Sequence, residues 1–376
     1  MSFLSLTGFS QRKTFINYSL DEGLPQSTVI SIYQDDYRNI WLGTQSGLCK
    51  FDGREMITYD TRNGMIGNHV TAIFEDSRSR FWFGHRYNGI SLLEGEKFKA
   101  LRISSQRITR IKEDVYGNIW IGTYGDGILI LPNDKKPEPE NFIRIKDSDL
   151  LPSLNVLDFL MIDKNKIWVA SWDSFYIIDY QENLELGNMK ISVPDNKTSP
   201  GQLVYTFVRK NNEDVYLLVK DGMIKLNMKA SNPFENAGFF PFGNGIEANW
   251  INQLTVGNDS LIWGTTKRGV FKFDGNFQFF TTKEGLPVEE MNAIMTDVEG
   301  NIWIGSTSSG AFKYIGDKFT IVDKKGGLQS DVILSLAEDK QNRIWICTDK
   351  GVSYFDGRNV LPFKNEHGLE GKAVEV

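Results

Sequence analysis

Few residues in this chain of 376 residues combine the types and spacing that catalysis or metal binding requires. The three histidines, His69, His85 and His367, lack the spacing of zinc ligands. Neighbouring carboxylates such as Asp35 and Asp36 would point apart on a strand, which predicts solvated side chains and not a general acid/base pair. A Gly-x-Ser-x-Gly nucleophile motif is absent from the sequence. We therefore expect no catalytic residue, no metal site and no cofactor.

A second set of residues suits ligand binding. Aromatic rings stack on the apolar faces of sugars, and planar or charged polar groups bind hydroxyls and anions. Nine tryptophans occur in the sequence, and only Trp172 and Trp250 fall outside the repeated pattern described next. The alternative for these two is that they pack beneath long loops. The candidate ligand-binding residues are Arg86, Tyr87, Tyr124, Asp126, Trp172, Asp173, Asn249, Trp250, Lys267 and Arg268.

The elements that must position these residues repeat eight times. Each unit has one large aromatic residue within an apolar run, and successive ones lie 38 to 48 residues apart. That period is typical of propellers and solenoids. The eight aromatic anchors are Trp41, Trp82, Trp120, Trp168, Tyr216, Trp263, Trp303 and Trp345.

Each unit contains four short strand signals. In the third unit an alternating segment at residues 108–114 ends in Asp-Val-Tyr-Gly-Asn, which is typical of a hairpin turn, and the apolar run 118–123 follows. The run is apolar on both faces, so its sheet must be covered on both sides. Glycines such as Gly43 suit positions where a neighbouring backbone or ring comes close. The pattern predicts an all-β fold, a β-propeller of four-stranded antiparallel blades.

The blade number leaves two arrangements open. We expect an N-terminal tail at residues 1–13, which reads like the end of a signal peptide, and a propeller at 14–323 formed by a closing strand and seven repeats. Residues 324–376 hold an eighth repeat and the start of a ninth. They either supply the last blade of an eight-bladed ring or begin a second propeller after a seven-bladed one.

The turns of the two rims differ between repeats. One rim carries the loops between units and the turns between second and third strands, and their sequences differ from repeat to repeat. The turns between first and second strands lie on the other rim, and their sequences stay similar. Variable loops on a rigid scaffold are where binding sites are usually built. The candidate binding residues all fall on this variable rim.

Composition excludes some partners. The formal net charge is −6 and the isoelectric point is near 5.4, which argues against a nucleic-acid partner. No apolar stretch approaches the roughly 20 residues of a membrane span, so we expect membrane attachment only through segments outside this chain. Cys49 and Cys347 lie in distant repeats, and we expect free thiols.

The repeated unit resembles the two-component regulator propeller repeat, most clearly at residues 21–60, 283–315 and 324–357. Members of that family form the periplasmic sensor region of hybrid two-component histidine kinases in bacteria that sense carbohydrates. The resemblance implies a periplasmic or extracellular sensor that binds an oligosaccharide or another small ligand, with any kinase activity outside this chain. It leaves open a homodimer of the full-length protein.

Two other functions stay open on the residues alone. A secreted propeller-fold polysaccharide lyase or glycoside hydrolase would need acidic residues at the centre of the variable rim. A protein-interaction scaffold would need a broad apolar patch on one rim.

Overall fold

The computed structural model describes residues 15–146, 151–172, 175–194, 203–243, 245–249, 251–282, 286, 288, 290–314, 322, 324, 327–341, 343–356 and 359–363. The described chain falls into two compact units, one spanning Phe15–Tyr314 and one within Ile315–Val376. Both consist of four-stranded antiparallel sheets, which confirms the predicted fold class.

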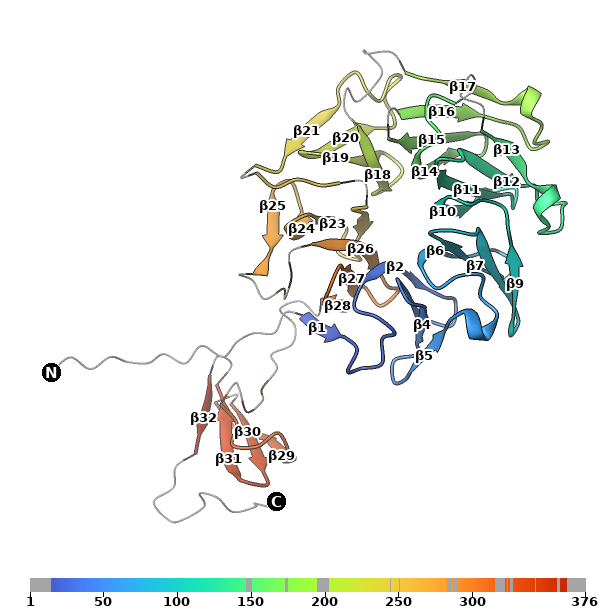
Figure 1. Ribbon diagram of the computed structural model, residues 1–376. Coiled ribbons are helices and arrows are strands. Elements are labelled where there is room, and N and C mark those ends of the chain that lie inside the picture. The colour runs from blue at the N-terminus through green and yellow to red at the C-terminus, as the bar shows by residue number, and fades with distance from the viewer. Residues whose placement is uncertain are drawn as a thin grey trace. The chain divides into compact units, whose positions relative to one another are not determined.

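The unit Phe15–Tyr314 is a closed ring of seven blades (Figure 1). The innermost strands of neighbouring blades pack against one another around the axis, and the last of them, β26, packs against the first, β2. The strands of blades one to three are β2 (Val29–Gln34), β3 (Ile40–Thr44), β4 (Leu48–Phe51) and β5 (Met56–Tyr59); β6 (Val70–Glu75), β7 (Phe81–His85), β8 (Ile90–Glu94) and β9 (Lys97–Leu101); and β10 (Arg107–Glu113), β11 (Ile119–Tyr124), β12 (Ile128–Leu131) and β13 (Ile143–Ile145).

Blades four to seven continue the same order around the ring. Their strands are β14 (Val156–Asp163), β15 (Lys166–Ser171), β16 (Phe175–Asp179) and β17 (Lys190–Ser192); β18 (Val204–Arg209), β19 (Asp214–Val219), β20 (Gly222–Asn227) and β21 (Gly238–Pro241); β22 (Leu254–Val256), β23 (Ile262–Thr266), β24 (Gly269–Phe273) and β25 (Phe277–Phe280); and β26 (Met291–Thr296), β27 (Ile302–Ser306) and β28 (Ala311–Tyr314), with β1 (Phe15–Tyr18) as the outer strand of blade seven. Short 3-10 turns η1 (Thr61–Asn63), η2 (Pro139–Asn141) and η3 (Leu186–Asn188) lie in the connections.

The first strand of the ring completes its last blade. β1 pairs antiparallel with β28, which places Phe15 opposite Tyr314 and Tyr18 opposite Ala311. The Phe15 ring also lies edge-on to Phe280 of blade six, at 5.9 Å between centroids. Backbone hydrogen bonds thereby join the two ends of the ring, and β28 is paired on both sides.

The second unit contains one further sheet. Its strands are β29 (Ile333–Glu338), β30 (Ile344–Thr348), β31 (Gly351–Phe355) and β32 (Val360–Pro362). Ile333 and Leu336 on β29 are 43% and 64% exposed. That this sheet begins a second propeller stays a prediction, and the expected ninth repeat lies outside the described residues.

Five of the eight aromatic anchors are fixed by an aspartate at the end of the preceding strand. In blade three the Trp120 indole Nε1 donates to Asp114 Oδ2 at 2.8 Å, while Asp114 Oδ1 accepts the backbone N–H groups of Tyr116 and Asn118. The same indole bond joins Trp41 to Asp35, Trp82 to Asp76, Trp303 to Asp297 and Trp345 to Asp339. One carboxylate therefore holds both the hairpin and the anchor.

This arrangement corrects one expectation. Asp35 was expected to be solvated, but only 5% of its surface is exposed. It accepts hydrogen bonds from the Asn39 backbone and the Trp41 indole, which compensate its removal from water.

Glycines on the second strands admit the neighbouring blade, as the sequence predicts. A Cβ at Gly84 would lie 2.5 Å from Ile108 Cγ2, on the innermost strand of blade three. A Cβ at Gly122 would lie 2.8 Å from Val156 Cγ1 of blade four. Ala170 and Leu218 occupy the corresponding register position in blades four and five.

We expect Trp120→Ala to lower the free energy of unfolding by about 3 to 5 kcal/mol, because it empties a fully buried site and leaves Asp114 without its indole partner. Chemical denaturation measures this change. Trp172→Ala is the matched control, since Trp172 is 37% exposed and should cost less. Equal losses for the two variants would contradict the anchor role of Trp120.

We expect Gly84→Ala to lower the free energy of unfolding by about 1 to 3 kcal/mol, because the new methyl group would overlap Ile108. Gly187→Ala provides the control, since a Cβ there meets no atom within 4 Å, and its effect should stay within about 0.5 kcal/mol. Thermal or denaturant unfolding of both variants tests the close blade contact. A Gly84→Ala protein as stable as the parent would contradict it.

Candidate functional site

An extra residue in the innermost strand of nearly every blade shapes the central channel. The pairing register shifts at the same point in β2, β6, β10, β14, β18 and β26, so that one residue of each is left between paired neighbours. Such a β-bulge turns a side chain out of the regular alternation. Five of these residues line one cavity, namely Ile30, Thr71, Thr109, Leu157 and Asn292.

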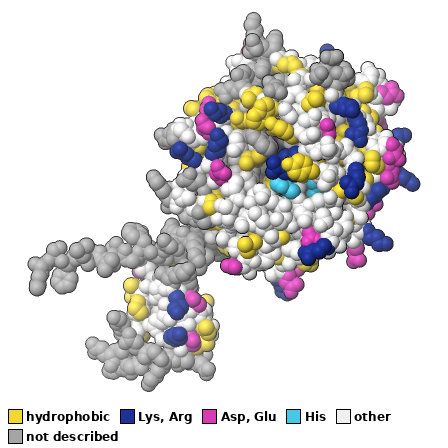
Figure 2. All heavy atoms as spheres, viewed as in Figure 1, with side chains coloured by type: hydrophobic (Ala, Val, Ile, Leu, Met, Phe, Trp, Pro, Cys, Tyr) yellow, Lys and Arg dark blue, Asp and Glu magenta, His cyan; other side chains and the backbone are white. Residues whose placement is uncertain are grey.

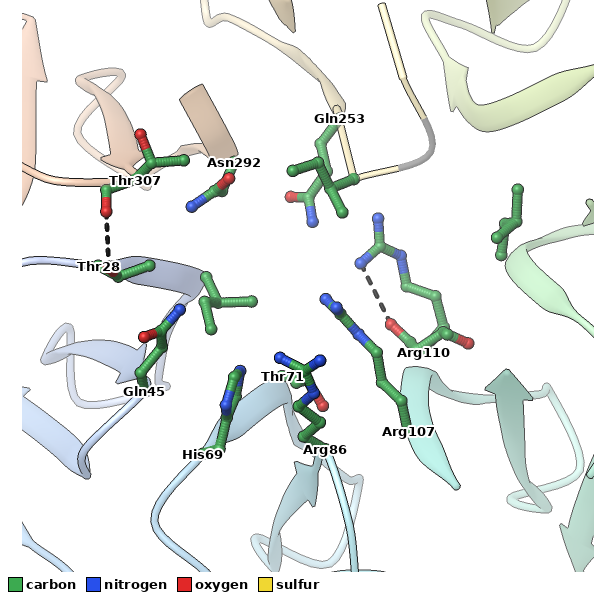
Figure 3. Close-up of a pocket in the computed structure, with 14 residues that line it drawn as sticks. Thr28, Gln45, His69, Thr71, Arg86, Arg107, Arg110, Gln253, Asn292 and Thr307 are labelled. Carbon is green, nitrogen blue, oxygen red and sulfur yellow. Dashed lines mark hydrogen bonds between the residues drawn. The ribbon is translucent and has the colours of Figure 1, made fainter. Parts of the chain in front are cut away.

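This cavity, which we call the mouth cavity, has a volume of about 200 Å³. It lies at the variable rim, because Gln45 and Arg86 follow the second strands β3 and β7, and Thr28 and His69 precede the innermost strands β2 and β6. The Arg86 backbone N–H donates to the carbonyl of His69, which joins turn and loop. Side chains from six of the seven blades line it (Figure 3). Figure 2 shows basic and histidine side chains gathered at a hollow in the face of the ring.

The mouth cavity is cationic. Arg86, Arg107 and Arg110 extend into it from blades two and three, and His69 lies beside them (Figure 3). Among the described residues that line the cavity, none is acidic. The guanidinium groups therefore set its electrostatic potential.

Burial and the repulsion between neighbouring positive charges lower the pKa values of Arg107 and His69. Burial, together with the charges of Arg86 and Arg110, lowers the pKa of Arg107 to about 10. Burial also lowers the pKa of His69 to about 4, with Arg107 and Arg86 contributing. At neutral pH His69 is consequently uncharged, whereas the arginines remain cationic.

Hydrogen bonds hold the lining residues in place. Arg86 Nε donates to the Tyr87 hydroxyl at 3.1 Å, and its guanidinium lies 5.5 Å from the Tyr87 ring centroid. Thr71 Oγ1 donates to the carbonyl of Ile108, and Thr109 Oγ1 donates across the next blade boundary. The lining is thus built on contacts between blades.

Arg110 and Gln253 separate the mouth cavity from a second cavity of about 400 Å³ deeper in the channel. Both residues line both cavities. With the Gln253 amide oxygen oriented toward Arg110, it accepts from Nη1 at 3.0 Å and Nη2 at 3.1 Å. This bridge between blades three and six forms the floor of the mouth cavity.

Asp158 anchors Arg110 from below. Arg110 Nε and Lys112 Nζ each lie 3.2 Å from Asp158 Oδ1, and Thr206 donates to Oδ2. Burial opposes ionisation of Asp158, but Lys112 and Arg110 outweigh it and hold its pKa below the usual value. The acid lies among the residues of the second cavity and not among those of the mouth cavity.

The structure distributes the residues predicted for binding over the rim. Arg86 lines the mouth cavity, and the Tyr87 hydroxyl accepts a hydrogen bond from the Arg86 side chain. Tyr124 and Trp172 form an edge-to-face pair with centroids 6.1 Å apart. Asp173 and Trp250 lie outside the described residues.

The remaining four predicted residues make local contacts. Asp126 accepts a hydrogen bond from Ser104, and Asn249 Oδ1 accepts the backbone N–H of Ile251. Lys267 pairs with Glu247 at 3.0 Å, and the Arg268 backbone donates to Thr266. Binding by these residues stays a prediction, and they do not share one pocket with Arg86.

Arg107, Arg110 and Gln253 were not predicted as site residues. The segment 108–114 was interpreted only as a strand of the scaffold, although the strand formed there, β10, carries Arg107, Arg110 and Lys112. That concentration of basic residues, in an otherwise acidic chain, is the signal that could have identified them. Gln253 carries no comparable signal.

Comparison with known proteins agrees with the fold and the repeat. The model of the family described as "Two component regulator propeller" matches residues 23–46, 64–87, 102–125 and 327–350. These four segments thus match the two-component regulator propeller repeat. The matched segments lie in blades one, two and three and in the sheet β29–β32.

A relative of these repeats is a histidine kinase. "Histidine kinase P4" of Formosa agariphila is 26% identical, over 90% of this chain and 26% of the kinase. The chain thus spans about a quarter of that relative. Within the part of the chain that the structure describes, no helix is long and apolar enough to cross a membrane.

Solved structures share the propeller fold. The extracellular domain of the putative hybrid two-component system BT3049 from B. thetaiotaomicron has a TM-score of 0.65 at 20% identity, covering 94% of this chain and 50% of that one. Virginiamycin B lyase from Staphylococcus aureus has a TM-score of 0.58 at 13% identity, covering 82% of this chain and 100% of the lyase. At these identities the likeness shows the fold alone.

We expect the His69 imidazole to titrate near pH 4, against about 6.5 in an unfolded chain. Because the unfolded state then binds more protons between these values, the free energy of unfolding should fall as pH falls through this window. NMR titration of the imidazoles, with denaturation at each pH, measures both effects.

Arg86→Ala should raise the pKa of His69, because it removes one of the neighbouring positive charges. His85 is an internal reference: burial lowers its pKa to about 4, the charge of His69 also lowers it, and Arg86 is not among the causes, so its pKa should change less than that of His69. An unchanged His69 titration in the Arg86→Ala protein would contradict the electrostatic description of the cavity.

Proposed function

We propose that this chain is the ligand-binding sensor part of a two-component signalling protein and that a carbohydrate binds at the mouth cavity. The observation that carries the proposal is the convergence of polar and cationic side chains from six blades on one cavity at the variable rim. The repeats and the related histidine kinase support the signalling context.

The lining suits a polyhydroxylated ligand. Gln45, Gln253 and Asn292 supply amide groups, and four threonines supply oxygen atoms. The Tyr124–Trp172 pair, on the turns of blades three and four, offers aromatic surface to sugar residues that extend beyond the cavity. A ligand bound in this way would contact several blades at once.

The proposed location and activity follow from the same context. The likeness to the extracellular domain of a putative two-component system supports a sensor in the periplasm or outside the cell. Kinase activity would lie in other segments of the full protein. A glycosidase is disfavoured, because the described residues around the mouth cavity contain no pair of carboxylates.

Calorimetric titration with oligosaccharides tests the proposal. We expect saturable binding without turnover, and a loss of affinity of about tenfold or more in Arg86→Ala, which removes a charged hydrogen-bond donor. Trp172→Ala should weaken only longer oligosaccharides. Arg54→Ala, at an exposed turn between β4 and β5, is the matched control and should bind as the parent does.

Two results would count against this function. Equal affinities of the parent and Arg86→Ala proteins would remove the mouth cavity from binding. Depolymerisation of a polysaccharide by the purified protein would instead favour a lyase or hydrolase.

A further inference from the structure

The distribution of charge in the channel runs against that of the whole chain. The formal net charge is −6, yet the mouth cavity is lined by three arginines and by no described acid. Asp158 pairs with Arg110 from below, but Arg107 is only partly exposed and lies close to the charges of Arg86 and Arg110, and this proximity costs free energy. A bound anion would offset this repulsion.

Donors and acceptors in the mouth cavity come from different side chains. Three threonine hydroxyls of the cavity donate hydrogen bonds to backbone carbonyls: Thr28 to Thr307, Thr71 to Ile108, and Thr109 to Val156. Their oxygen atoms therefore remain as acceptors only. The protons that face the cavity come from the guanidinium groups, the His69 imidazole and the amides of Gln45 and Gln253.

The arginines come from two elements of adjacent blades. Arg107 and Arg110 lie on β10, and Arg86 follows β7. Figure 3 shows the three guanidinium groups directed toward the same space. Planar guanidinium groups bind carboxylate and sulfate through paired hydrogen bonds, which single ammonium groups cannot match.

The floor and the size of the cavity limit how a ligand enters. The Arg110–Gln253 bridge lies between the mouth cavity and the second cavity beneath it. A volume of about 200 Å³ is smaller than the roughly 300 Å³ at which pockets for drug-sized ligands begin. Only one end of an extended ligand fits.

Resting on the function proposed above, we infer that the mouth cavity binds the anionic group of a terminal sugar residue, a carboxylate or a sulfate. Arg86, Arg107 and Arg110 contact the anion, and neutral His69 donates a further hydrogen bond. The rest of the oligosaccharide extends from the cavity over the variable rim.

Calorimetry with matched probes tests this inference. The probes are trigalacturonate, its methyl ester without charge, an unsaturated chondroitin 6-sulfate disaccharide and sodium sulfate. We expect at least one of the two acidic saccharides to bind about tenfold or more tightly than the methyl ester, and its affinity to fall as sodium chloride is added. Preference for trigalacturonate assigns the carboxylate, and preference for the disaccharide with competition by sodium sulfate assigns the sulfate.

Variants separate charge from folding. Arg86→Gln and Arg110→Gln should each weaken the acidic saccharide about tenfold or more, and Arg110→Lys should recover part of the loss because it keeps the charge. Arg54→Gln should have no effect. Near-ultraviolet circular dichroism confirms that each variant retains its packing, and Arg86→Gln decides the test if Arg110→Gln does not fold.

The outcomes distinguish the inference from the function on which it rests. If the methyl ester binds as tightly as trigalacturonate, the anion inference is wrong while carbohydrate binding stands. If sodium sulfate binds in an Arg86-dependent manner and no saccharide does, the anion site stands and the carbohydrate function is wrong. If none of the four probes binds, the inference is overturned.

Discussion

The structure depends on how each innermost strand meets the next blade. A β-bulge places one extra residue near the start of the strand, and in several blades that residue bonds a carbonyl of the neighbouring blade. Thr71 donates to Ile108, Thr109 to Val156, and Asn292 Nδ2 to Val29 at 3.0 Å. The last of these joins blade seven to blade one, so the ring is closed at its centre as well as at its circumference.

The same residues connect the scaffold to the site. Because a bulge residue faces the channel, the feature that ties two blades together also supplies lining to the mouth cavity. Glycines on the second strands let the blades approach closely enough for these bonds to form. A substitution that separated two blades would therefore disturb the cavity together with the ring.

Much of the fold was predictable from the sequence because its signals are local. The hairpin at Asp114–Asn118 and the anchor Trp120 lie within seven residues of one another, so both can be predicted from neighbouring residue types. The site was less predictable, because it joins residues from blades far apart in sequence. Arg86 was identified from a variable turn, whereas Arg107 and Arg110 on β10 meet Gln253 of blade six only when the ring is formed. Asp35 was misjudged because its partner, an indole six residues away, was treated as an apolar side chain alone.

The pairing of β1 with β28 has a consequence for biosynthesis. Phe15 is made early, but its partner Tyr314 emerges from the ribosome only after all the other blades. Until then the seventh sheet cannot form, and the early strand remains available for wrong pairing. Contacts of such long sequence separation form slowly, so closure of the circle is expected to be the late and rate-determining event in folding of this unit.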